Sequence, residues 1–129
     1  MKPTTVEWLE IAQEDLDAAE AMFRGGRYLY AGFESQQSAE KALKAVIQET
    51  TRVPPKIHNL VTLASEAGLE RQDLIERLAT LSAYYIATRY PEVRKELGQR
   101  TTLDVAEGLL TTAQEVIAWA KQQLTSSAS

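Results

Sequence analysis

The last quarter of the chain carries the feature that most restricts the fold. Between positions 103 and 124, apolar residues recur at steps of three and four over about six helical turns. They are Leu103, Ala106, Leu110, Ala113, Ile117, Ala120 and Leu124. A β-strand would alternate with a period of two, so this spacing predicts a long amphipathic helix, capped by Thr101 or Thr102.

Helical periodicity extends through most of the chain and predicts two helices in its first half. The first is expected to begin at a capping box, in which Thr4 is the N-cap and Glu7 lies three residues on. It ends at the glycine pair of "RGGR", and its buried stripe is Trp8, Ala12, Leu16, Ala19 and Phe23. The second runs from about residue 27 to residue 48, and its core face is Ala39, Ala42, Leu43, Val46 and Ile47.

Two more helices are expected in the middle of the chain. A short one covers "NLVTLASEA" and stops at Gly68. The next spans about 72–88 and must end near Arg89, because Pro91 disfavours helical geometry in the residue before it. Its core line is Leu74, Leu78, Leu81 and Tyr85. The stretch "EVRKELGQR" is expected to be a charged connection to the last helix.

Together these elements predict an all-α fold, an up-and-down bundle of four long helices plus one short helix. A chain of 129 residues has the size of one domain, so residues 1–124 are expected to form a single helical domain. Residues 125–129, "TSSAS", are expected to be a small polar tail that frays.

Composition and charge exclude several classes of function. The chain has no cysteine, which excludes disulfides, thiolate zinc sites and cysteine nucleophiles. Its net charge of -4 argues against a protein whose whole surface grips nucleic acid, but allows a local basic patch. No apolar run approaches the roughly 20 residues of a membrane span, and "MKPTTVEWLE" is too polar for a secretion signal. We therefore expect a cytoplasmic protein with no membrane segment.

The motifs of metal and phosphate sites are missing. One histidine cannot complete the Glu and Glu-x-x-His set of a di-iron bundle, so no metal site is predicted. "RGGR" lacks the Lys-Ser/Thr of a P-loop. No cofactor is predicted beyond a possible nucleotide ligand.

Two groups of cations are candidates for binding an anion. Lys41 and Lys44 share a polar stripe with Gln37 and Gln48, which is either a solvated helix face or a surface for phosphate or a partner. Arg89 continues the apolar line of its helix, so its guanidinium either caps the bundle end, pairs with a buried acid, or contacts an anion.

Next to Arg89, Tyr90 could stack on a base and Arg94 adds a second fork-shaped cation.

The stretch "TRVPPKIHNL" contains Arg52 and the only histidine, His58. His58 is the one candidate for a general acid or base, or else a helix-entry residue bonded to a nearby loop. Arg52 lies six positions earlier, a separation that imitates a nuclease motif. The intervening prolines keep the two residues off one helical face, so we assign no catalytic residue.

Three segments, in this order and spacing, resemble the HEPN domain family of prokaryotes and higher eukaryotes. They are "AQEDLDAAEAMFRGGRYLYAGFESQQSAEKALKAVIQE", "HNLVTLASEAG" and "YYIATRYPE". The resemblance implies a helical bundle that dimerises and binds nucleotides, partners a separately encoded minimal nucleotidyltransferase, or cleaves RNA as a toxin. Ribonuclease members use an arginine followed by a histidine four to six positions later. Here Arg89 is present but no histidine follows it, and Arg94 cannot act as a base because it stays protonated.

Three hypotheses follow. The first is a non-catalytic HEPN-type homodimer that binds a nucleotide or RNA through Lys41, Lys44, Arg89, Tyr90 and Arg94. In this hypothesis it can also be the helical partner of a nucleotidyltransferase in a toxin–antitoxin pair. The second is a metal-independent ribonuclease toxin that uses Arg89 with His58. The third is a purely structural interaction module. Apolar residues beside the core stripe of the last helix favour dimerisation, because one helix cannot bury all of them: Leu109, Val116 and Trp119.

Overall fold

The computed structural model describes residues 1–51, 53–87 and 89–128, with side chains through residue 125 in those ranges. Its elements are α1 (Pro3–Arg24), α2 (Tyr28–Thr50), α3 (Leu60–Ala67), α4 (Gln72–Ser82), the 3₁₀ helix η1 (Ala83–Ile86), α5 (Pro91–Arg100) and α6 (Leu103–Ala128). No strand occurs in these ranges, so the predicted all-α class is confirmed.

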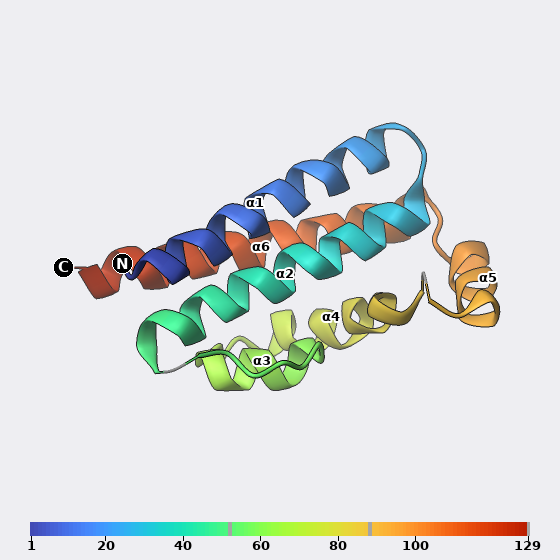
Figure 1. Ribbon diagram of the computed structural model, residues 1–129. Helices are drawn as coiled ribbons and strands as arrows, with labels where there is room; N and C mark the ends of the chain where they lie inside the picture. The colour runs from blue at the N-terminus through green and yellow to red at the C-terminus, as the bar shows by residue number, and fades with distance from the viewer. Residues whose placement is uncertain (52, 88, 129) are drawn as a thin grey trace.

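The helices form an up-and-down bundle, as predicted (Figure 1). The long helices α1, α2 and α6 lie side by side, with α2 antiparallel to α1 and in contact with α6. The fourth position is filled by α3 and α4 together, which run back along α2. The predicted fourth helix is therefore shorter than expected: α4 ends at Ser82 and continues as η1. Its expected end at Thr88 lies outside the described residues.

Two local predictions are wrong. The charged segment after Pro91 is the helix α5 and not a connection, because proline is well suited to the first position of a helix. Apolar periodicity could not detect this charged helix, because none of its residues is buried. The capping box is also wrong: α1 begins at Pro3 after Lys2, and no side chain caps it.

Three predicted helix ends are confirmed. The turn after α1 has Gly26 at φ 74°, and Gly68 closes α3 at φ 84°, both in the left-handed region that favours glycine. In addition to these, Asn59 caps the start of α3 with its side chain, which accepts hydrogen bonds from the backbone N–H groups of Val61 and Thr62. The last helix begins at Leu103, after Thr101 and Thr102, as predicted. It reaches Ala128 and so extends beyond Leu124 into the segment that was expected to be a polar tail.

The core lies where α2 meets α1, α3, α4 and α6. Helix α2 comes close to the ring of Tyr84 at Gly32, because a Cβ atom there would lie 2.7 Å from the ring. Tyr84 is 3 % exposed, and its hydroxyl is 2.6 Å from Thr101 Oγ1, which in turn donates to the carbonyl of Leu97. One ring thus joins α2 to the junction between α5 and α6.

The side positions of α6 are buried within the chain. Leu109 is 5 % exposed, Val116 is 0 % exposed, and Trp119 is partly buried against the core. The argument for a dimer from these residues is therefore wrong. Helices α2, α1 and α4 all contact α6 and together cover its side positions. None of the described helices combines the length and apolarity that a bilayer crossing requires.

Candidate anion-binding site

A buried ionic network on α2 forms the inner part of the candidate site. Glu40 is 2 % exposed, and its carboxylate accepts hydrogen bonds from Lys44 Nζ at 3.0 Å and Gln36 Nε2 at 3.1 Å. His58 Nδ1 lies 3.1 and 3.0 Å from the two carboxylate oxygens. Lys44 is itself only 5 % exposed, and its ammonium lies 5.7 Å from the centre of the Trp8 ring.

Burial acts on Glu40 most strongly and by itself would raise the pKa of its carboxyl group. The hydrogen bonds from Lys44, Gln36 and His58, with the charge of Lys44, outweigh burial and hold the pKa below its ordinary value. Glu40 is therefore an ionised, acceptor-only group inside the protein.

Sequence reasoning missed Glu40 and Gln36. The sequence placed Lys44 on an exposed stripe, either solvated or open to phosphate or a partner, whereas in the structure Lys44 points inward to Glu40. The signal was available in the spacing of Gln36, Glu40 and Lys44, each four residues apart and therefore on one helical face. What the sequence did not reveal is that this polar face is covered by the chain around His58.

The outer part of the site is a stack of three side chains. The His58 ring lies on the Tyr85 ring with centroids 3.9 Å apart and an angle of 12° between planes. The Cζ atom of Arg89 lies 4.5 Å from the centre of the same Tyr85 ring. The structure therefore brings together the two residues of the ribonuclease hypothesis, 31 positions apart in the sequence.

Arg89 is exposed and follows the end of η1, so it does not continue a helical stripe as expected. Within the described residues, the ion pairs formed by arginines belong to Arg71, Arg77 and Arg100, and not to Arg89. Of the alternatives for Arg89, pairing with a buried acid is therefore not what the described residues show.

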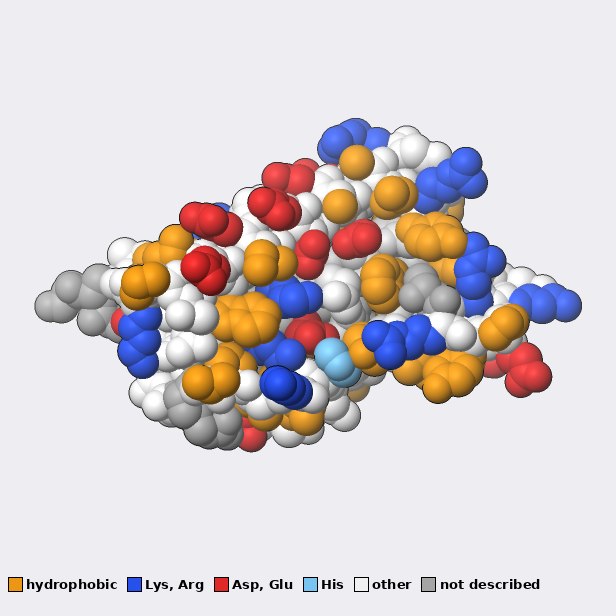
Figure 2. Space-filling view, in the orientation of Figure 1, with side chains coloured by type: hydrophobic (Ala, Val, Ile, Leu, Met, Phe, Trp, Pro, Cys, Tyr) orange, Lys and Arg blue, Asp and Glu red, His pale blue; other side chains and the backbone are white. Residues whose placement is uncertain are grey.

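A cavity of about 210 Å³ opens beside the stack. Its lining residues are His58, Asn59, Ser82, Ala83, Tyr85 and Ile86. In the surface view the chain's only histidine, coloured pale blue, is open to solvent between basic and apolar side chains (Figure 2). Its side chain is 42 % exposed, so a ligand in the cavity can reach the ring.

The other predicted cations do not join this stack. Lys41 Nζ is 3.1 Å from Gln37 Oε1 and 3.9 Å from Asp15 Oδ2. Burial raises the pKa of Asp15, an effect that Lys41 partly offsets. Arg94 lies over the Tyr30 ring at 5.3 Å and donates to its hydroxyl. Tyr90 is 59 % exposed.

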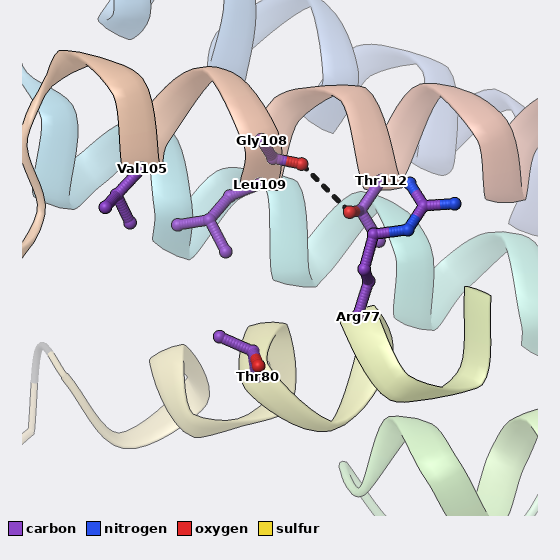
Figure 3. A pocket seen from close by; sticks show the side chains of 6 residues that line it. All are labelled: Arg77, Thr80, Val105, Gly108, Leu109 and Thr112. Carbon is purple, nitrogen blue, oxygen red and sulfur yellow. Dashed lines mark hydrogen bonds between the residues drawn. The ribbon is translucent and has the colours of Figure 1, made fainter. Parts of the chain in front are cut away.

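A second cavity, of about 190 Å³, lies between α4 and α6 (Figure 3). Gly108, Leu109 and Val105 line it from α6, and Arg77 and Thr80 line it from α4. The cation among its lining residues, Arg77, is already paired with Glu115 and Asp73. The cavity therefore offers an anion no unpaired positive side chain among the residues that line it.

In the described part of the chain, no three acidic or histidine side chains are arranged to hold a metal ion. Arg52, the other half of the nuclease-like spacing, lies outside the described residues.

Comparison with known proteins identifies related sequences and folds. The model of the HEPN domain matches residues 5–123. The structure of TT1696 from Thermus thermophilus is 30 % identical, with 95 % of this chain and 99 % of that one covered and a TM-score of 0.85. ST0689, described as an archaeal HEPN homologue, is 29 % identical, with 95 % and 98 % covered and a TM-score of 0.78.

A HEPN domain protein (tm0613) from Thermotoga maritima shares the fold, with a TM-score of 0.73, 24 % identity and coverage of 92 % and 98 %. Among curated proteins, no sequence matches this chain.

Proposed function

Because this chain belongs to the HEPN domain family, we propose that it binds a nucleotide or a similar phosphate-bearing anion at Arg89, His58 and the cavity beside them. The observation that carries the proposal is the exposed guanidinium of Arg89, stacked on Tyr85 and without a carboxylate partner in the described chain. Stacking on an aromatic ring leaves the N–H edges of a guanidinium free, and these edges match the oxygens of a phosphate.

The remaining candidate residues take different parts in this proposal. Tyr85 has His58 and Arg89 against its ring, so the exposed ring of Tyr90 is the better surface for a nucleobase. Arg94 and Lys41 are outer cations that attract the ligand. Lys44 holds Glu40 in place and does not contact the anion, because its ammonium is buried.

Changing Arg89 to alanine should weaken nucleotide binding by about ten- to a hundredfold, because a charge-assisted phosphate contact is lost. Calorimetric titration of both proteins with ATP, GTP and a short RNA measures the effect. Arg100→Ala is the matched control: Arg100 is also exposed but pairs with Glu96 at 3.0 Å, and its loss should leave binding unchanged. If the unmodified protein binds none of these ligands, the proposal is wrong.

A metal-independent ribonuclease is the second candidate, favoured by the packing of His58 and Arg89 on one tyrosine ring. In such a reaction His58 would take the proton of a ribose 2′-hydroxyl, and the 2′-oxygen would bond to phosphorus. The bond from phosphorus to the 5′-oxygen would break, and water would protonate that oxygen. This candidate predicts RNA cleavage that His58→Ala abolishes, measured with an end-labelled RNA. Equal cleavage by that variant would exclude it.

The proposal also includes homodimerisation, partnership with a minimal nucleotidyltransferase and a toxin–antitoxin role. These three are supported by family membership alone. The third hypothesis, a purely structural module, does not explain why the guanidinium of Arg89 is exposed over the Tyr85 ring.

A further inference from the structure

We propose that Glu40 is a positioning residue that fixes His58 in one tautomer, so that the cavity selects a phosphate ester with a free hydroxyl group, as in a ribonucleotide. In this tautomer Nδ1 carries the proton and Nε2 is a hydrogen-bond acceptor. The inference rests on the proposed function, because it concerns the ligand of the same site.

The first step concerns what Glu40 can do. A carboxylate surrounded by two donors, Lys44 Nζ at 3.0 Å and Gln36 Nε2 at 3.1 Å, is held in its ionised form. An ionised carboxylate has no proton to donate. The bond between Glu40 and His58 therefore has only one possible direction, from Nδ1–H to the carboxylate.

The second step concerns the other ring nitrogen. A neutral imidazole has one donor and one acceptor nitrogen, so a proton fixed on Nδ1 makes Nε2 the acceptor. Both hydrogen-bond contacts of the ring are made by Nδ1, and Nε2 has no partner in the described part of the chain. The ring is part of the cavity wall, so Nε2 is the nitrogen left for a ligand.

The third step concerns the ligand. Two acceptors repel, so a neutral Nε2 disfavours a bare phosphate oxygen and favours a hydroxyl, which can donate. Ser82 also lines the cavity. Its Oγ already accepts a hydrogen bond from the N–H of Leu60, so its hydroxyl proton remains available to an oxygen of the ligand. With Arg89 beside the same stack, the site suits a phosphate next to a sugar hydroxyl.

The tautomer can be observed directly, since the chain contains one histidine. Protein labelled with ¹⁵N-histidine should show a protonated Nδ1 and an unprotonated Nε2 by NMR at a pH of about 8.5, which favours neutral imidazole. In Glu40→Gln, Lys44 should keep the amide oxygen and leave the NH₂ group facing Nδ1, so the tautomer should reverse. A protonated Nε2 in the unmodified protein overturns the inference, whether or not the variant folds.

The ligand choice is tested by titrating the unmodified protein with AMP, 2′-deoxy-AMP and 3′-deoxy-AMP. At least one deoxy analogue should bind about tenfold more weakly than AMP, because Nε2 loses its donor. Equal binding of all three overturns the inference but leaves nucleotide binding intact. Failure of all three to bind overturns this inference and the proposed function together.

Discussion

Replacing Lys44 with methionine should lower the free energy of unfolding by about 3–5 kcal/mol. Lys44 is 5 % exposed and supplies the only ammonium in contact with the buried carboxylate of Glu40 in the described chain. Methionine keeps much of the length and apolar area of the lysine, so the loss reports the uncompensated charge and not a cavity. Urea denaturation at neutral pH measures the difference.

The matched control is the same substitution at Lys41, three residues earlier on α2. Lys41 is more exposed, its carboxylate contact with Asp15 is 3.9 Å long, and we expect a change of at most about 1 kcal/mol. Equal losses at the two positions would contradict a special role for the buried pair.

The loss from Lys44→Met should also depend on pH. The folded state holds the pKa of Glu40 below its unfolded value, so its stabilisation is present above the unfolded pKa and is lost as pH falls through the folded one. The difference in the free energy of unfolding between the unmodified protein and Lys44→Met should therefore become smaller at acidic pH.

Replacing Gly32 with alanine should cost about 1–3 kcal/mol, although alanine is the better helix former. The added Cβ would lie 2.7 and 2.8 Å from two atoms of the Tyr84 ring and 3.1 Å from Leu109. The ring cannot move aside freely, because Tyr84 is buried and its hydroxyl is bonded to Thr101. Thermal unfolding followed by circular dichroism measures the loss.

Gly108→Ala is the control for this prediction, because Gly108 also lies within a long helix. A Cβ atom at Gly108 would meet nothing within 4 Å, so only helix propensity acts there. We expect that variant to be more stable by about 0.5–1 kcal/mol. Changes of the same sign at both glycines would show that the contact with Tyr84 does not decide the outcome.

Most of the fold could be predicted from the sequence, because it depends on local signals. Apolar spacing located the long helices, and the glycine pair of "RGGR" and Gly68 marked two helix ends, because glycine adopts the left-handed backbone conformation found there. The helix after Pro91 could not be found in this way, since none of its residues is buried and only Val93 and Leu97 are even partly covered. Its start signal is a proline before a charged segment, and the same proline also predicts the end of the preceding helix.

The candidate site was less predictable, because it depends on which segments meet. Arg89 and His58 were both candidates, but they come together because both pack on the ring of Tyr85. The sequence predicted Tyr85 only as a core residue. The burial of Lys44 depends on Glu40 and His58, which belong to different segments. Periodicity identifies a helical face but not what covers it.

The weak attachment of α5 has a consequence for the dynamics of the molecule. No residue of α5 is buried, and a few contacts hold it: Leu97 against the core, the bond of Thr101 to Tyr84, and Arg94 on Tyr30. Such a segment opens at a free energy well below that of global unfolding. We therefore expect the helix that follows Tyr90 to detach and reclose as a separate cooperative unit, while the buried ionic network stays intact, because Gln36, Glu40 and Lys44 lie on α2.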